Sequence, residues 1–297
     1  MLDNFFRPKS VAVIGASKEA GSVGHSIFSN MLSYDFQGEV FGINPKGGEL
    51  LGRRLYRSLA ELEKSPDLAV VAVPAKIVPQ IIDECGEAGI DAVIIISAGF
   101  KEIGPEGARR EREIVEKAQA RGIRIIGPNC LGVIAPSIGL NASFAAGMPQ
   151  AGNVAVLSQS GALATAVLDW AFEQGMGFSR FVSFGNAADV ELNELIEALG
   201  EDDETEVVLI YMEGVRDGGE FMRVAEKVGR KKPLVVMKSG GTASGARAVS
   251  SHTGSLAGSE QAYRAAFRQT GVIQADSVEE LFDRAVAFST LPLPPGR

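Results

Sequence analysis

The sequence predicts a protein of the α/β class, with two open and mostly parallel sheets that are covered by helices on both faces. Short apolar, β-branched segments alternate with longer segments of helical periodicity along all 297 residues. The short segments are almost continuously apolar, as in parallel strands buried on both faces. This scheme runs through the chain twice, and the length suits two domains.

The first half contains five predicted strands and three predicted helices, the pattern of a Rossmann-type domain. The strands are residues 11–14, 40–43, 68–73, 92–97 and 123–126. The helices are residues 23–32, 77–88 and 106–120. Pro105 and Gly122 flank the third helix, and these residue types mark a helix start and stop.

The second half repeats the alternation and predicts a flavodoxin-like doubly wound domain. Its strands are residues 154–157, 181–184, 207–211, 234–237 and 272–274. Its helices are residues 162–173, 190–199, 219–228, 258–268 and 278–289. Residues 135–152 contain two prolines and little periodicity, so we expect them to connect the units. The expected domains are residues 1–135 and 136–290, followed by a Pro-rich tail or linker at 291–297.

Composition excludes several classes of protein. The chain has 37 acidic and 29 basic residues, a net charge of −8, which argues against a nucleic-acid-binding surface. Cys85 and Cys130 are too few for a disulfide framework and too isolated for a thiolate zinc site, so we expect no metal. No targeting segment or membrane-length apolar stretch occurs, which predicts a cytoplasmic protein without membrane contact.

A long glycine loop, residues 15–24, follows the first predicted strand and leads into a helix. Open α/β sheets bind ligands at the carboxyl ends of their strands, so its backbone N–H groups are candidates for holding a phosphate. The loop matches neither G-x-G-x-x-G nor the P-loop of nucleoside triphosphatases. A strand-to-helix turn without a ligand stays open as an alternative.

The second predicted strand ends in Asn44-Pro45-Lys46-Gly47-Gly48. A site for NAD places an acidic residue there to bind the ribose hydroxyls. Lys46 instead suits a ribose that carries a phosphate, as in coenzyme A or NADP, although a solvated turn lysine is the alternative.

The next three strands end in small or turn-forming residues, which leaves room for an extended ligand across this edge. These ends are Val73-Pro74-Ala75, Ser97-Ala98-Gly99-Phe100-Lys101-Glu102 and Gly127-Pro128-Asn129-Cys130-Leu131-Gly132. We interpret Cys130 as a small buried thiol rather than a nucleophile.

The two histidines differ in their surroundings. We expect His25, near the start of the first long helix, to be a cap or a pocket wall. His252 lies in residues 239–259, where 17 of 21 residues are Gly, Ala, Ser or Thr. Such a segment cannot form a core, which predicts a mobile, backbone-rich loop. A flexible loop with an incidental histidine is the alternative.

Two features of the second half bear on His252. Ser158-Gln159-Ser160-Gly161 ends a strand and opens a helix, which predicts an anion site made by hydroxyls, N–H groups and the helix dipole. Glu213 follows the strand at 207–211 and would orient an imidazole through one ring nitrogen, unless it is a solvated loop acid. Together these features predict a phosphoryl relay.

These motifs resemble the α subunit of succinyl-CoA synthetase and, more closely, the corresponding domains of NDP-forming acyl-CoA (acetyl-CoA) synthetases. The resemblance runs from about residue 5 to residue 289. The five motifs that carry it, in order, are residues 15–24, 44–48, 127–132, 158–161 and 251–254.

The resemblance implies that the first domain binds coenzyme A and that the second carries a phosphohistidine. In the family, an acyl-CoA reacts with phosphate to give an acyl phosphate, and a histidine then takes the phosphoryl group. That histidine matches His252, and the acid that steadies it matches Glu213. Phosphate binding falls on Ser158, Ser160 and Gly161. The implied coenzyme A residues are Gly15, Ser17, Gly21, Ser22, Val23, Gly24, Lys46, Pro74, Ser97, Ala98, Gly99 and Asn129.

The resemblance also implies a partner. In the family, the loop hands its phosphoryl group to ADP or GDP on an ATP-grasp domain, which holds the nucleotide and magnesium. None of the motifs here belongs to such a domain, so we expect an ATP-grasp subunit or domain as partner, in an oligomer. The tyrosine that follows Ser-x-Ser-Gly in the succinate enzyme is absent around Thr165, which leaves a smaller or apolar carboxylic acid open as substrate.

Two alternatives remain beside a ligase. A non-catalytic module that binds CoA or acyl-CoA and regulates another protein fits a chain without the nucleotide domain. An NADP-dependent oxidoreductase fits only the glycine loop and Lys46 and leaves the second domain unexplained. The proline-rich segment at 291–297 fits a natural tail or the junction to a further domain, as in the fused synthetases.

Overall fold

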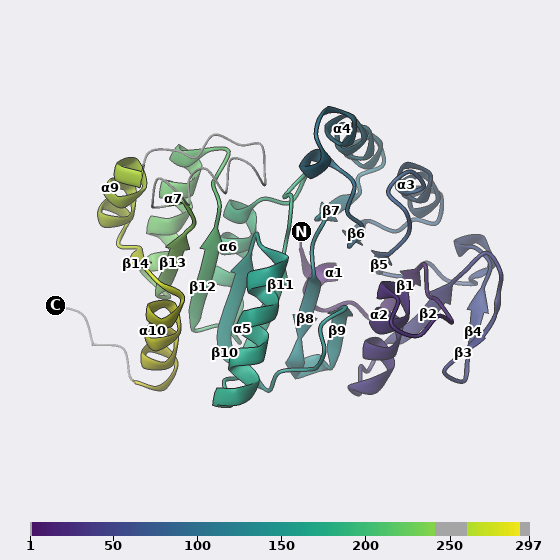
Figure 1. The fold of residues 1–297 in the computed structure, drawn as a ribbon, viewed down its shortest axis with the longest axis horizontal. Helices are drawn as coiled ribbons and strands as arrows, with labels where there is room; N and C mark the ends of the chain where they lie inside the picture. The colour runs from purple at the N-terminus through teal and green to yellow at the C-terminus, as the bar shows by residue number, and fades with distance from the viewer. Residues whose placement is uncertain (1, 241–259, 292–297) are drawn as a thin grey trace. The chain divides into compact units, whose positions relative to one another are not determined.

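The computed structural model describes residues 2–240 and 260–291, and the chain folds into two compact units (Figure 1). Unit 1 is Met1–Met148 with Val182–Val190, and unit 2 is Pro149–Phe181 with Glu191–Arg297. The segment Val182–Val190 belongs to unit 1 because its backbone pairs there: Ala188 N–H donates to the Gly127 carbonyl at 2.9 Å. The domain boundary expected between residues 135 and 136 stays a prediction.

Unit 1 contains a seven-stranded sheet in the order β3-β4-β2-β1-β5-β6-β7. Its strands are β1 (Ser10–Ile14), β2 (Glu39–Ile43), β3 (Gly48–Leu50), β4 (Arg53–Tyr56), β5 (Leu68–Val71), β6 (Ala92–Ile95) and β7 (Arg124–Ile126). Each neighbouring pair is parallel except β3 with β4. The chain leaves β1 toward β2 and later returns on its other side as β5. The switch point of the sheet therefore lies between β1 and β5.

Helices cover this sheet and form its core. They are α1 (Asp3–Phe6), α2 (Val23–Ser33), α3 (Val78–Glu87) and α4 (Pro105–Ala120), with short 3-10 turns η1 (Leu59–Glu61), η2 (Lys101–Ile103) and η3 (Pro136–Ile138). Ile82 of α3 and Ile114 of α4 are fully buried in one cluster with strand residues such as Val93. Phe28 of α2 is also fully buried and lies outside this cluster, where α2 contacts β1 and β2.

The expected connection at residues 135–152 is corrected by the structure. Strand β9 (Leu140–Ser143) lies within this segment and forms a hairpin with β8 (Gly132–Ala135), and the first strand of unit 2 already begins at Ala151. Asn141 and Ser143 of β9 are fully buried, and Ser143 Oγ donates to Asn141 Oδ1 at 2.6 Å. Because these polar side chains form hydrogen bonds to each other, they can be buried in a strand. Such a strand is not an apolar run, so its sequence does not predict it.

Unit 2 has the strand order β14-β13-β12-β10-β11. Its strands are β10 (Ala151–Ser158), β11 (Phe178–Ser183), β12 (Val207–Met212), β13 (Leu234–Lys238) and β14 (Ile273–Ala275). Numbered along the chain this order is 2-1-3-4-5, the flavodoxin-like arrangement. The pairs β10–β12, β12–β13 and β13–β14 are parallel, and the switch point lies between β10 and β12.

Helices lie on both faces of this second sheet (Figure 1). They are α5 (Gly161–Gln174), α6 (Leu192–Gly200), α7 (Gly218–Gly229), α9 (Glu260–Thr270) and α10 (Val278–Thr290). Trp170 of α5 stacks on Phe282 of α10 with ring centres 3.9 Å apart, which joins these helices on one face. Phe221 of α7 meets Phe267 of α9 edge-on at 6.0 Å on the other face. The predicted doubly wound α/β class is confirmed.

Some element boundaries differ from those expected. The helix expected at 190–199 begins at Leu192, because Glu191 is its N-cap and forms a capping box with Glu194. The strand expected at 181–184 is β11, which begins three residues earlier at Phe178. Within residues 2–240 and 260–291, no helix combines the length and the apolar character needed to cross a membrane.

Candidate functional site

The loops that follow the parallel strands of unit 1 are joined by hydrogen bonds into one continuous edge. Gly15 N–H donates to the Ile43 carbonyl at 3.0 Å, and Asn44 Nδ2 donates to the Ala16 carbonyl at 2.7 Å. Farther along, Ser97 Oγ donates to the Val73 carbonyl at 2.6 Å. The structure therefore brings the predicted coenzyme A residues to one edge, and their role stays a proposal.

The last strand end joins the same edge through the backbone. Asn129 N–H donates to the Ser97 carbonyl at 3.0 Å, and Asn129 has a left-handed φ of 58°. Pro74, in the loop after β5, and Ala98, in the loop after β6, are exposed.

The glycine loop of unit 1 ends in a helix N-terminus with a side-chain cap. Ser22 Oγ accepts the N–H of His25 at 3.3 Å, and His25 Nδ1 lies 2.9 Å from the Ser17 carbonyl. The N–H groups of Val23 and Gly24 have no hydrogen-bond partner among the residues that the structure describes. The N-cap is therefore Ser22 and not His25, whose ring contacts the loop instead, and two N–H groups are left for an anion.

Two glycines let the loop pass close to its neighbours. A Cβ atom on Gly24 would stand 1.9 Å from the Gly15 carbonyl oxygen. Gly15 has a φ of 99°, and a Cβ there would stand 2.4 Å from the Ala72 carbonyl oxygen at the end of β5. The backbone geometry therefore requires glycine at both positions.

Glu102 and Asn186 hold the loop after β6, a role that the sequence motifs do not reveal. Glu102 accepts the N–H of Phe100 at 3.0 Å and the side-chain amide of Asn186 at 2.8 Å. It also accepts the N–H of Gly99 at 2.5 Å. Burial raises the pKa of Glu102, but these hydrogen bonds outweigh burial and hold the pKa below its ordinary value. A polar residue close behind a strand end is the signal that could have identified Glu102.

Glu102→Gln should therefore destabilise the protein at neutral pH by about 1–2 kcal/mol, the scale of hydrogen bonds to a charged acceptor. The lowered pKa means that the carboxylate contributes in full above its ordinary pKa of 4.5 and less as pH falls through the folded value. Urea unfolding should thus show a difference from wild type that shrinks between pH 7 and pH 3. Glu116→Gln, which removes an exposed acid of α4 that forms no ion pair within the described residues, is the matched control. A difference that stays constant with pH would contradict this account.

Neither cysteine is placed for nucleophilic chemistry. Cys85 and Cys130 are both buried, and burial raises the pKa of each thiol to about 12. Cys130 Sγ also donates to the Ile95 carbonyl at 3.3 Å. Both thiols are therefore protonated at neutral pH and shielded from reagents.

We expect Ellman's reagent at pH 8 to label neither thiol in the folded protein and both in guanidinium chloride. The denatured sample is the positive control for the two thiols. Rapid labelling of Cys130 in the folded protein would restore it as a candidate nucleophile.

The predicted anion motif of unit 2 forms a second helix N-terminus, at the switch point between β10 and β12. Ser160 is the N-cap of α5, and its Oγ accepts the N–H of Leu163 at 3.3 Å. Ser158 Oγ donates to the Ser160 carbonyl at 2.8 Å. The N–H groups of Gly161 and Ala162 have no hydrogen-bond partner within the described ranges. These groups form a site of the kind that binds phosphate.

Glu213 lies next to this motif because Gln159 joins the two loops. Gln159 Oε1 accepts the N–H groups of both Glu213 and Gly214, the second at 3.2 Å. The Gln159 amide donates back to the Gly214 carbonyl at 3.2 Å. Gln159 belongs to the predicted anion motif, but the motif alone does not predict its contact with Glu213. His252, the predicted nucleophile, lies outside the described residues.

Lys238 is a buried cation at the same edge of unit 2. Its ammonium donates to the Ser239 carbonyl and lies 5.0 Å from the centre of the Tyr263 ring. Burial lowers its pKa, while Glu260 and Glu213 act in the opposite direction. This edge of unit 2 therefore holds a cation close enough to Glu213 to interact with its carboxylate.

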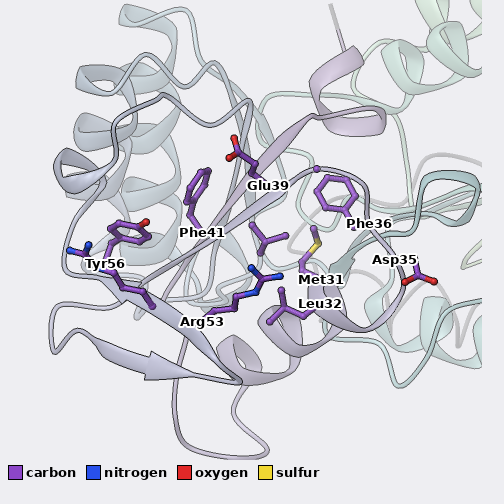
Figure 2. Close-up of a pocket in the computed structure, with 11 residues that line it drawn as sticks. Met31, Leu32, Asp35, Phe36, Glu39, Phe41, Arg53 and Tyr56 are labelled. Carbon is purple, nitrogen blue, oxygen red and sulfur yellow. The ribbon is translucent and has the colours of Figure 1, made fainter.

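A cavity of about 530 Å³ lies in unit 1 at the opposite end of β2 (Figure 2). Its wall includes Glu39, the first residue of β2, and Figure 2 shows Met31 and Leu32 of α2 facing Phe41 and Arg53. Ligands of open α/β sheets bind at the carboxyl ends of strands, so this cavity is not the candidate site.

Two family matches define the class of protein. Residues 9–136 match the family described as "CoA binding domain", and residues 151–288 match "Succinyl-CoA ligase like flavodoxin domain". The chain thus contains a CoA-binding domain followed by a ligase-type flavodoxin domain.

Similar proteins show which family of ligases the chain resembles. The chain is 53% identical over 285 residues to ADP-forming acetate–CoA ligase I of Archaeoglobus fulgidus, covering 96% of this chain and 41% of that protein. It is 47% identical to the α subunit of ADP-forming acetate–CoA ligase I of Pyrococcus furiosus, covering 99% of this chain and 65% of that subunit. The chain therefore spans less than two thirds of either relative.

A solved structure agrees with these relatives. Acetyl-coenzyme A synthetase 1 of Ca. Korarchaeum cryptofilum, in complex with phosphate and ADP, matches with a TM-score of 0.96 and 41% identity, covering 100% of this chain and 64% of that one. The chain belongs to the α-type domains of the NDP-forming acyl-CoA synthetases. This confirms the resemblance that its motifs suggested.

Proposed function

We propose that the chain is the CoA-binding and phosphohistidine-carrying part of an ADP-forming acyl-CoA synthetase. The reaction is acyl-CoA, phosphate and ADP to carboxylic acid, CoA and ATP, in either direction. The observation that carries the proposal is the capped N-terminus of α5. Within the described residues, the N–H groups of Gly161 and Ala162 have no hydrogen-bond partner there. Gln159 joins this N-terminus to the loop of Glu213.

The first step needs CoA and phosphate in defined places. The edge of unit 1 binds CoA through the glycine loop, Lys46 and the loop after β6. Ser160 and the first N–H groups of α5 bind phosphate in unit 2. A phosphate oxygen attacks the thioester carbonyl, the C–S bond breaks, and CoA leaves as the thiolate while the acyl phosphate forms. Hydrogen bonds from the backbone N–H groups hold the phosphate in position for this attack.

The second step transfers the phosphoryl group to His252. One ring nitrogen attacks phosphorus, the P–O bond to the acyl group breaks, and the carboxylate leaves. Glu213 accepts the N–H of the other ring nitrogen, which orients the ring and stabilises its positive charge. The phosphohistidine then donates its phosphoryl group to ADP, which restores neutral imidazole.

The last transfer requires a partner. We propose an ATP-grasp subunit or domain that binds ADP with magnesium, because no motif in this chain accounts for nucleotide binding. Relatives named as acetate–CoA ligases favour acetate as the carboxylic acid. The net charge of −8 gives no basis for a nucleic-acid partner.

The test is reconstitution. The chain and an ATP-grasp subunit of a relative are mixed with acetate, CoA and MgATP, and acetyl-CoA is measured by chromatography. Turnover is expected only when both proteins are present. CoA binding without turnover, for any small acid or nucleotide, would favour the alternative of a non-catalytic CoA-binding module.

A further inference from the structure

Three cationic side chains from three separate segments gather around one turn of unit 1. The turn is Asn44–Gly48, after β2, and it contains Lys46. A Cβ atom on Gly48 would stand 2.4 Å from Lys18 Nζ, so the ammonium of Lys18 lies against Gly48. A Cβ on Gly47 would stand 3.3 Å from Cγ and 3.4 Å from Nε of Arg57. The two glycines thus make room for both side chains.

Hydrogen bonds of Asn44 fix the conformation of this turn. Asn44 N–H donates to the Tyr56 carbonyl at 2.8 Å, which places Arg57 directly beside the turn. The Asn44 side chain donates to the Ala16 carbonyl at 2.7 Å, which fixes the start of the segment that carries Lys18. Asn44 Oδ1 also accepts the N–H of Lys46 at 2.9 Å. One asparagine therefore ties all three cation-bearing segments together.

The cations have no acidic counterpart in the part of the chain that the structure describes. No ion pair there involves Lys18, Lys46 or Arg57. The nearby carboxylate of Glu61 accepts the N–H of Arg57 at 3.1 Å and pairs with the guanidinium of Arg54 at 3.6 Å. Three like charges held near one turn repel one another, and an anion between them would remove that repulsion.

We propose that Lys18 and Arg57 join Lys46 in binding the phosphate monoester on the ribose of CoA, so that this turn discriminates CoA from dephospho-CoA. The inference rests on the proposed CoA binding and deepens it, because sequence reasoning pointed only to Lys46. Ammonium and guanidinium groups make charge-assisted hydrogen bonds to a phosphate monoester, which carries close to two negative charges at neutral pH. The loop N–H groups at the start of α2 remain for the diphosphate.

Calorimetric titration of the full chain with CoA and with dephospho-CoA tests this. Wild type should bind CoA at least about tenfold more tightly. Lys18→Met and Arg57→Met should each raise the Kd for CoA by about 5- to 10-fold and the Kd for dephospho-CoA by less than about twofold. Lys18→Arg, which keeps the charge, should restore most of the CoA affinity.

Lys9→Met is the matched control, because this exposed lysine precedes β1 at the opposite end of the strand. It makes the same change in net charge and should leave both affinities unchanged. Equal weakening of CoA and dephospho-CoA by Lys18→Met and Arg57→Met would overturn the assignment and place these residues elsewhere on the ligand. If wild type binds neither compound, the proposed CoA binding itself fails, and the assignment fails with it.

Discussion

Gly24→Ala is expected to abolish CoA binding and to lower the free energy of unfolding by about 3 kcal/mol or more. The added Cβ would stand 1.9 Å from the Gly15 carbonyl oxygen, and the atom it meets is backbone, not the end of a flexible side chain. Relief requires the glycine loop to move away from the start of α2, which separates the N–H groups that would face the ligand. Urea unfolding and calorimetry with CoA measure the two effects.

Gly161→Ala is the matched control for this change. A Cβ at Gly161 meets nothing within 4 Å, and the residue is the first of helix α5. Alanine there should leave CoA binding intact and raise stability by up to about 1 kcal/mol, because it restricts the unfolded chain. A Gly24→Ala protein with wild-type stability and CoA affinity would show that the loop and helix do not pack as described.

His252→Asn is expected to lower acyl-CoA formation by at least about 10³-fold, the scale on which loss of a catalytic nucleophile acts. Asparagine can hydrogen-bond but cannot accept a phosphoryl group as imidazole does. CoA affinity should not change, because His252 is not among the residues proposed to bind CoA. The reconstituted enzyme provides the rate, and titration of the chain provides the affinity.

Glu213→Gln separates the orienting role from the chemical one. The amide keeps the size of the side chain but loses its charge, so phosphorylation of His252 should slow by about 10²-fold without disappearing. Retention of full turnover by His252→Asn would remove the phosphohistidine from the mechanism, whatever the result for Glu213→Gln.

Much of the fold is predictable from the sequence because buried parallel strands are nearly continuous apolar runs. Strands such as β12, with four fully buried residues in a row, and β5, with all four residues buried, fit that pattern. Strand β4 (Arg53–Tyr56) does not, since two arginines open it and both are exposed. Strand β4 lies beside the edge strand β3, and both are held by backbone pairing, so their side chains give no continuous apolar run.

The candidate sites are also only partly predictable from the sequence. Strand ends are visible in the sequence, so the loops at Gly15, Lys46 and Ser160 can be identified from the order of residue types alone. The contacts between those loops cannot. Gln159 beside Glu213 and Lys18 against Gly48 depend on how loops from different strands meet, and neither spacing along the chain nor residue type encodes that.

The most direct test of the central claim is to locate the phosphoryl group. The chain is incubated with its ATP-grasp partner and MgATP, without acid or CoA, then quenched in alkali and examined by tandem mass spectrometry. The account predicts one phosphoryl group, on the imidazole of His252, that disappears when acetate and CoA are added and acetyl-CoA forms. A phosphoryl group on another residue, or acetyl-CoA formed by a chain that is never phosphorylated, would contradict it.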